Sequence, residues 1–329
     1  MTTPVTRLAA ITKTLLAAKL DYTAVRNGAS QLKELFQEVI AFDEGGQYHS
    51  IDTHSGKAID TAAAAFCIMD MMRTRVFLRG IEEAIRMQLQ QQPGKPVTVL
   101  YAGTGPFATL LTPLTTVFGP AELQLILLEI NPVSMEYLDK TIRVFNMGLY
   151  ILDKVLADAA TYRIPAAQQP DIVLSETMNY ALYKEPQVSI FANLSGQRPG
   201  ALLIPEMIMV EAALIERDDT GTNSSIIPLK MLLELNAATA QRISKEEGAV
   251  PVLTDGIRVE LPSLSYPVTD KLALLTHIKV FGEHTLSTNE CGLTMPFAVP
   301  NIPSAGANPS ALRFTYKRGA VPGFIVSGE

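Results

Sequence analysis

Three hydrophobic runs in the middle of the chain each end within two residues of a carboxylate, and this pattern restricts the fold most strongly. The pairs are Leu123–Leu128 with Glu129, Tyr150–Leu156 with Asp158, and Ile172–Leu174 with Glu176. Buried parallel strands are continuous hydrophobic segments, and ligands in open α/β sheets bind where such strands end. A helix-like segment at 134–146 separates the first two runs. The sequence therefore predicts a doubly wound α/β sheet with ligand-facing acids along one edge.

A glycine turn follows an earlier aliphatic run and completes this edge. Val97–Tyr101 leads into Gly103-Thr104-Gly105, where missing side chains let the backbone approach a ligand closely. Glu129 comes 24 residues after Gly105, a position from which a carboxylate can accept hydrogen bonds from both hydroxyls of a ribose. Asp158, at the end of the next strand, suits the exocyclic amine of adenine. We therefore expect an adenosyl ligand at this edge.

NAD enzymes and S-adenosylmethionine-dependent methyltransferases share such an edge. Ala108 replaces the third glycine of the dinucleotide fingerprint, and Pro106 lies inside the turn, which argues against NAD. A helix is predicted over Thr109–Val117, so that the N–H groups at its start can bind polar ligand groups.

A second carboxylate, Glu185, follows Glu176 after nine positions. A loop of this length can fold back so that two acceptor-only groups face a common space. Facing carboxylates repel unless a cation with several donors lies between them, and a planar guanidinium is such a cation. The alternative is that Glu176 caps a helix beginning near Thr177 and that Glu185 is a solvated loop charge.

Composition limits the classes of partner. The net charge of −6 and a pI near 5.4 argue against an extended nucleic-acid surface. Two cysteines and four histidines show no metal-site spacing, so no metal is expected. Lys13 and Lys19 interrupt the apolar positions near the N-terminus, and no run is long enough to cross a bilayer. We expect a cytoplasmic protein without membrane contact.

The 329 residues predict three regions. Residues 1–55 carry apolar positions at helical spacing, residues 56–205 form the ligand-binding α/β domain, and residues 206–329 form a β-rich domain. The expected strands of the last region are Met207–Ile215, Gly256–Leu261, Lys271–Phe281, Gly292–Val299 and Leu312–Val326. A long helix is expected over Ala58–Gln88, and another interrupts the β-rich region at Pro228–Arg242.

Several motifs in order resemble the protein arginine methyltransferase family, over about Ala58 to Ile215. They are Asp70-Met71-Met72-Arg73-Thr74, Gly103-Thr104-Gly105, Glu129, Ser175-Glu176-Thr177-Met178-Asn179-Tyr180 with Glu185, and Leu203-Ile204-Pro205. The resemblance implies a Rossmann-like methyltransferase sheet followed by a mostly antiparallel β-barrel-like domain, with an N-terminal helical segment. It also implies a homodimer that binds S-adenosylmethionine and methylates a guanidino nitrogen, either of a small molecule or of arginine in a peptide.

The resemblance assigns roles to single residues. Arg73, by itself an ordinary solvated helix charge, would hold the carboxylate of S-adenosylmethionine, and Glu176 and Glu185 would hold the guanidino group. Asp158 lies near the adenine-side acid, although Ala160 is an alternative counterpart. Further substrate contacts are expected from Met178 and Tyr180 of the double-glutamate loop, and from His277 in Thr276-His277-Ile278, which is similar to a Thr-His-Trp loop.

The chain also departs from this family. Thr177 stands where the family loop usually has Trp, the chain has no Trp, and the tyrosine-rich helix over the cofactor has no clear copy. The region after Pro205 is shorter than a barrel with a dimerisation arm. These differences favour free arginine or a related guanidino metabolite as substrate. There are two alternatives. The substrate is another small biosynthetic intermediate, or the protein is a cofactor-binding partner subunit without catalytic activity.

Overall fold

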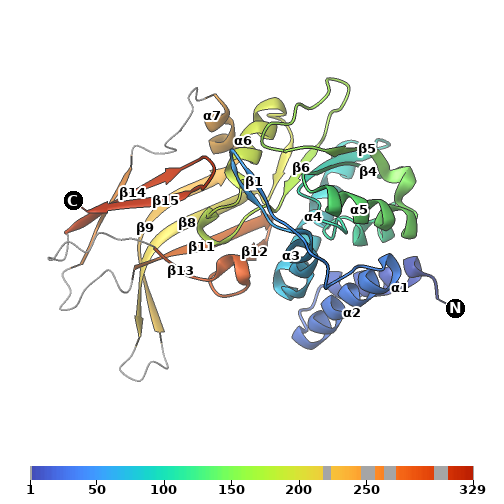
Figure 1. The fold of residues 1–329 in the computed structure, drawn as a ribbon, viewed down its shortest axis with the longest axis horizontal. Coiled ribbons are helices and arrows are strands. Elements are labelled where there is room, and N and C mark those ends of the chain that lie inside the picture. Colours follow the sequence, from blue (N-terminus) through green and yellow to red (C-terminus); the bar gives the residue numbers. More distant parts are fainter. Residues whose placement is uncertain (1, 218–223, 246–255, 263–271, 300–309, 329) are drawn as a thin grey trace.

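The computed structural model describes residues 2–217, 224–245, 256–262, 272–299 and 310–328, and its elements form three regions (Figure 1). Two N-terminal helices lie against a parallel sheet with flanking helices, and an antiparallel β region lies on the other side of that sheet. The mixed α/β architecture with an N-terminal helical segment is thus as predicted.

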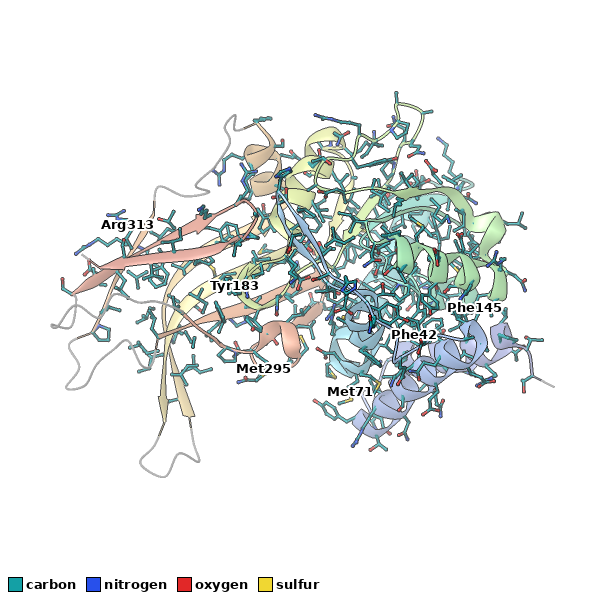
Figure 2. All side chains as sticks on the ribbon, viewed as in Figure 1. Phe42, Met71, Phe145, Tyr183, Met295 and Arg313 are labelled. Atoms are coloured by element: carbon teal, nitrogen blue, oxygen red, sulfur yellow. The ribbon has the colours of Figure 1, made fainter. Side chains whose placement is uncertain are left out.

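The N-terminal region consists of α1 (Pro4–Leu16) and α2 (Tyr22–Ile40). Each helix begins at a residue that caps it: the side chains of Thr3 and Asp21 accept hydrogen bonds from backbone N–H groups of the first turn. Aromatic side chains join α2 to the sheet domain, since the ring centroid of Phe36 lies 4.8 Å from that of Phe107 and 5.4 Å from that of Phe145. Figure 2 shows Phe42 and Phe145 in this junction.

A short hairpin, β1 (Ile51–Thr53) and β2 (Gly56–Ala58), follows the first two helices. The predicted boundary between residues 55 and 56 falls inside this hairpin. The helix expected over Ala58–Gln88 is divided into α3 (Thr61–Phe66), the 3₁₀ helix η1 (Cys67–Met69) and α4 (Met71–Gln91). The division occurs at Asp70, whose carboxylate caps α4 by accepting a hydrogen bond from the Arg73 N–H.

The parallel sheet has the strand order β5-β4-β3-β6-β7. Its strands are β3 (Val97–Ala102), β4 (Leu123–Glu129), β5 (Ile151–Leu156), β6 (Ile172–Ser175) and β7 (Leu202–Ile204), and its flanking helices are α5 (Pro132–Val144) and α6 (Gln187–Gln197). The order reverses at β3, between β4 and β6, which is where doubly wound sheets open a crevice for ligands. The predicted strand ends therefore meet at one edge.

The helix predicted over Thr109–Val117 is wrong. This segment forms turns and the 3₁₀ helix η2 (Pro113–Thr116). Pro113 has no N–H to donate and its ring disturbs the preceding turn of an α-helix, so it can only begin a helical turn here. Another 3₁₀ helix, η3 (Met147–Tyr150), precedes β5.

The C-terminal region contains two antiparallel sheets, with orders β12-β11-β8-β9 and β10-β14-β15, and β13 also pairs with β11. The strands are β8 (Met207–Arg217), β9 (Ser224–Asn236), β10 (Ile257–Glu260), β11 (Leu272–Phe281), β12 (His284–Leu286), β13 (Phe297–Ala298), β14 (Ala311–Lys317) and β15 (Gly323–Gly328). The 3₁₀ helices η4 (Tyr180–Leu182) and η6 (Gly292–Thr294) accompany them. The two sheets approach each other where the Lys230 Nζ of β9 donates to the Arg258 carbonyl of β10 at 2.9 Å. Closure into a barrel stays a prediction.

The helix predicted over Pro228–Arg242 is wrong in its first half. β9 continues to Asn236, and α7 (Ala237–Ser244) begins only after it. The leucines and methionine of this stretch favour a helix, but pairing with β8 overrides that preference. Pro228 is tolerated because β9 is the last strand of its sheet.

Candidate active site

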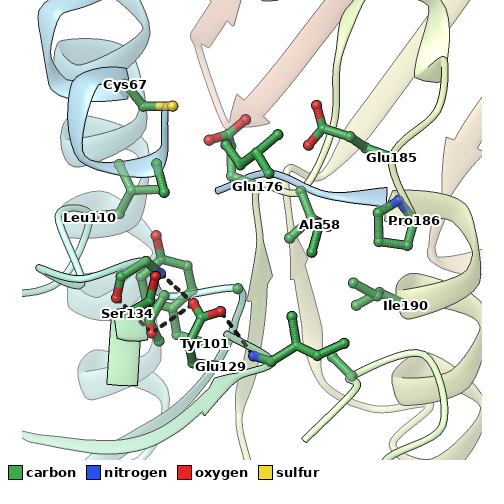
Figure 3. A pocket seen from close by; sticks show the side chains of 18 of the residues that line it. Ala58, Cys67, Tyr101, Leu110, Glu129, Ser134, Glu176, Glu185, Pro186 and Ile190 are labelled. Carbon is green, nitrogen blue, oxygen red and sulfur yellow. Dashed lines mark hydrogen bonds between the residues drawn. The ribbon is translucent and has the colours of Figure 1, made fainter. Parts of the chain in front are cut away.

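A pocket lies at the carboxyl edge of the parallel sheet, beside the hairpin and the start of α4 (Figure 3). Its free space is about 960 Å³ including the part that opens to solvent. Seven residues predicted for the site line it: Arg73, Gly103, Gly105, Glu129, Asp158, Glu176 and Glu185. Motifs from over a hundred residues of chain thus converge on one space.

Glu129 ends β4 and is 6% exposed. Its carboxylate accepts hydrogen bonds from the N–H groups of Gly105 at 2.7 Å, Ile130 at 2.9 Å and Asn131 at 2.8 Å. Burial raises the pKa of Glu129, and these backbone donors partly offset that effect. The Thr104 hydroxyl makes a fourth, longer contact to the carboxylate at 3.5 Å, so a ligand hydroxyl could take the place of this weakest donor.

The glycine turn adopts left-handed backbone, with φ of 77° at Gly103 and 62° at Gly105. A Cβ added at Gly103 would lie 2.3 Å from the Thr177 methyl carbon, so a glycine is required where these two loops touch. The turn leads into further turns and not into an α-helix. The expected ligand contact with a helix start is therefore wrong, and individual backbone groups of the turn line the pocket instead.

Asp158 lines the pocket two residues after β5, together with Ala157 and Ala159. Its Oδ1 accepts a hydrogen bond from the Ala160 N–H at 2.8 Å, which fixes the carboxylate at the strand end. Ala160, the alternative counterpart, is not among the lining residues. Of the two candidates only Asp158 lines the pocket, and its contact with adenine stays a prediction.

Arg73 points into the pocket from the first turn of α4. Its Nη2 donates to the Glu176 carboxylate in an ion pair, and the two side chains are 14% and 6% exposed. Burial lowers the pKa of Arg73, but the charge and hydrogen bond of Glu176, together with Cys67 and Asp70, outweigh this effect and the net shift is upward. Arg73 is therefore a buried, charged member of the site and not a solvated helix charge.

Glu176 follows β6 directly, and its second oxygen, Oε1, is buried without a hydrogen-bond partner in the described structure. Figure 3 shows Glu185, at the other end of the same loop, with both carboxylates in the same part of the pocket. Burial and the charge of Glu176 raise the pKa of Glu185 to about 8, while Arg73 acts in the opposite direction. Burial also raises the pKa of Glu176, against the opposing effect of Arg73. The two acids therefore form a coupled pair that holds a proton near neutral pH.

The alternative roles of the two acids are wrong. No helix begins near Thr177, whose N–H donates to the side chain of Gln187 at 2.9 Å. Glu185 is half-buried and lines the pocket, which contradicts a solvated loop charge. Both acids therefore line one pocket, and their catalytic roles stay a prediction.

The double-glutamate loop, residues 176–185, is held in a strained conformation. Ala181, Leu182 and Lys184 all have positive φ angles, between 53° and 68°. The Ala181 N–H donates to Thr276 Oγ1 at 2.8 Å, and the Tyr316 hydroxyl donates to the Leu182 carbonyl at 2.8 Å. Thr276 lies on β11 and Tyr316 on β14, so the antiparallel region fixes this loop.

The hairpin holds the other end of the same loop. The Lys57 N–H donates to the Lys184 carbonyl at 2.8 Å, and the Lys184 N–H donates to the Pro322 carbonyl at 2.9 Å. Gly56 has φ of 140°, and a Cβ there would lie 2.8 Å from the Lys184 oxygen. The hairpin also contributes Thr53 and Ala58 to the pocket lining. Sequence analysis missed the hairpin residues, although Gly56 after a polar turn was a signal.

Three predicted substrate contacts do not line the pocket. Met178 is 3% exposed, and Tyr180 stacks on Phe297 with ring centroids 4.9 Å apart. Successive side chains of a strand point to opposite faces, so His277 points away from the loop that Thr276 contacts. The His277 Nε2 lies 4.0 Å from a Glu211 carboxylate oxygen. The pocket also contains Cys67, which was not predicted there.

The described residues contain no group of three or more His, Cys, Asp or Glu side chains arranged for a metal ion. No helix among them combines the length and the apolar character needed to cross a membrane.

Comparison with known proteins gives a likeness in structure. No protein-family model matches the chain, and no curated protein matches it significantly by sequence. A chain of the Trypanosoma brucei PRMT1 enzyme-prozyme heterotetrameric complex with AdoHcy matches with a TM-score of 0.50 and 11% identity, covering 75% of this chain and 90% of that chain. The parallel sheet, N-terminal helices and antiparallel sheets therefore have the fold of an arginine methyltransferase-like protein.

Proposed function

We propose that this protein is an S-adenosylmethionine-dependent methyltransferase acting on a guanidino nitrogen held by Glu176 and Glu185. The observation that carries the proposal is the buried Glu176 Oε1 without a partner in the described residues, in the pocket that Glu185 also lines. A buried, unsatisfied carboxylate oxygen costs free energy, so this pocket suits a donor from outside the chain. A guanidinium brings a positive charge and five N–H donors in one plane.

The residues on the sheet side of the pocket fit the cofactor. Glu129 can accept from a ribose hydroxyl in place of its long contact from Thr104, and Asp158 can accept from the adenine amine. Gly103 and Gly105 line the pocket with backbone in the left-handed region. Arg73 gives one N–H group to Glu176, and the rest of its fork can bind the carboxylate of the cofactor. The match to a methyltransferase complex with AdoHcy supports the same cofactor.

The two acids align the acceptor and redistribute its charge. When bound, S-adenosylmethionine supplies a sulfonium methyl group, whose S–C bond breaks with its electron pair passing to sulfur as the N–C bond forms. Glu176 and Glu185 hold the guanidinium and draw its positive charge away from the attacking nitrogen. That nitrogen then loses one proton, so the methylated guanidinium keeps a single positive charge. Glu185, which the bound guanidinium keeps ionised, is the group that accepts this proton.

The acceptor we favour is free arginine or a related small guanidino metabolite. The Glu176 side chain is only 6% exposed, and the hairpin is hydrogen-bonded to the residue before Glu185. Both features favour a small molecule that enters the pocket as a whole over an arginine within a protein.

The test is incubation of the protein with methyl-labelled S-adenosylmethionine and free arginine, beside an arginine-containing peptide. We expect tandem mass spectrometry to place the label on the guanidino group of free arginine. Label on an amine, imidazole or hydroxyl acceptor, with none on any guanidine, would refute the proposal that the acceptor is a guanidino nitrogen. Cofactor binding without turnover on any acceptor in a broad panel would instead favour a partner subunit without catalysis.

A further inference from the structure

A buried glutamine brackets Glu176 on both sides. Gln187, the first residue of α6, is fully buried at 0% exposure. Its Nε2 donates to the Ser175 carbonyl at 3.1 Å, and its Oε1 accepts from the Thr177 N–H at 2.9 Å. One side chain thus holds the peptide groups immediately before and after Glu176.

These hydrogen bonds lie where the backbone pairing of β6 with its neighbouring strands has ended. β6 stops at Ser175, so Glu176 and Thr177 lie in a segment without regular hydrogen bonds. The Thr177 hydroxyl adds contacts to Gln187 Oε1 at 3.2 Å and to the Ser175 hydroxyl at 3.0 Å. Its methyl group packs against Gly103 of the glycine turn. Without Gln187, the backbone around Glu176 would lose both fixed partners.

We propose that Gln187 is a positioning residue that sets the backbone around Glu176, so that one carboxylate oxygen meets Arg73 and the other stays directed into the pocket. This inference rests on the proposed function for its kinetic consequences. Gln187 is not itself a contact for substrate, because its amide oxygen and nitrogen are both bonded within the protein and it does not line the pocket. Its effect on the reaction passes through Glu176.

The chain offers a matched control at the other end of the same helix. Gln197 also bonds the backbone with both ends of its amide: Oε1 accepts from Ile164 N–H at 3.0 Å, and Nε2 donates to the Tyr162 carbonyl at 2.9 Å. It contacts neither loop of the pocket in these bonds. Gln187→Met and Gln197→Met therefore remove equivalent interactions, one at the site and one remote from it.

The kinetic experiment compares these variants with the wild type. We expect Gln187→Met to lower kcat by about 10- to 100-fold, as for a misplaced electrostatic contact, with the Kd for S-adenosylhomocysteine changed less than about threefold. Gln197→Met, at a half-buried position, should keep kcat within about twofold while also lowering the thermal unfolding temperature. Equal kcat losses in both variants would overturn a positioning role, because both would then reflect general stability.

A conservative variant gives a pH signature. Protonated Glu at position 187 can still donate to Ser175 and accept from Thr177, whereas the ionised form cannot donate and repels Glu176. The ratio of kcat for Gln187→Glu to that of the wild type should therefore fall as pH rises. The wild-type profile, measured in parallel, shows how much of the pH dependence comes from Glu176 and Glu185 in the unchanged protein. A ratio that stays constant from pH 6 to 9, with loss at every pH, would contradict the inference.

A measurement without turnover separates this inference from the proposed function. Carboxyl carbon NMR of the glutamate-labelled protein follows the titration of Glu176 in wild type and in both methionine variants. We expect Gln187→Met to shift that titration, since the pairing with Arg73 loosens, and Gln197→Met to leave it unchanged. If the wild type fails to methylate guanidines, the proposed function falls while this comparison still decides the role of Gln187. Identical titrations in all three proteins would overturn that role.

Discussion

Binding of a guanidinium to the unliganded pocket should release a proton from Glu185. In the free protein, burial and the charge of Glu176 raise the pKa of Glu185 to about 8, so the carboxyl is mostly protonated at neutral pH. A guanidinium beside it stabilises the ionised form and lowers the pKa again. The proton is then displaced by the ligand.

The size of the release follows from the pKa. With a pKa of about 8, roughly 0.9 of the Glu185 side chains carry a proton at pH 7, about 0.5 at pH 8 and about 0.1 at pH 9. If the bound guanidinium holds the acid fully ionised, these fractions are the protons released per ligand. The release should therefore decrease with rising pH across this window.

Isothermal titration calorimetry measures this number directly. Arginine is titrated into protein saturated with S-adenosylhomocysteine, in phosphate and in Tris at the same pH. The slope of the observed enthalpy against the ionisation enthalpy of the buffer is the number of protons exchanged. Glu185→Gln is the control and should abolish the release at pH 7. Arginine binding with no buffer dependence at pH 7, or with a release that grows toward pH 9, would refute the reasoning.

Four further outcomes are expected. Glu176→Gln and Glu185→Gln should each lower turnover by roughly 10²-fold while the Kd for S-adenosylhomocysteine stays nearly unchanged, as steady-state kinetics and calorimetry can check. Arg73→Ala should weaken cofactor binding first, by about tenfold or more, because it removes a charged contact; retained affinity would contradict its role. Because the pKa of Glu185 is raised, the folded state loses stability as pH rises from 4.5 through about 8. Glu185→Gln should therefore raise the free energy of unfolding at pH 9 by up to about 5 kcal/mol, from the change in pKa. Urea titrations should show no change in this free energy at pH 4. Gly56→Ala should destabilise the fold by about 2 kcal/mol, because its Cβ meets the Lys184 oxygen at positive φ; an unchanged midpoint in thermal unfolding would show that the hairpin can move away at little cost.

The strand ends and their acids were predictable because a buried parallel strand is a continuous hydrophobic run that can be recognised in the local sequence. Glu129, Asp158 and Glu176 each follow a hydrophobic run, and the structure brings them to one pocket. The direction of Arg73 was less predictable from helix periodicity alone, since an arginine in a first turn is usually solvated. Only its resemblance to a motif indicated that it turns inward.

The errors come from interactions between distant segments. Residues 228–236 have helix-forming side chains, but β8 supplies strand partners that the local sequence does not reveal. The hairpin strands have three residues each, and one of their stabilising contacts is the carbonyl of Lys184. Gln187 looked like an ordinary polar residue at a helix start until Ser175 and Thr177 were seen beside it. Polar contacts of this kind have no sequence period.

The double-glutamate loop is hydrogen-bonded to residues that the ribosome adds both before and long after it. The loop is tied to Lys57, near the beginning of the chain, and to Thr276 and Pro322, which are synthesised long after it. The strands that line the pocket precede these partners in synthesis, whereas the loop with the two acids gains its last hydrogen bonds only when Thr276 and Pro322 are present. Under the proposed function, a chain released before these residues were made would lack the fixed geometry for methyl transfer.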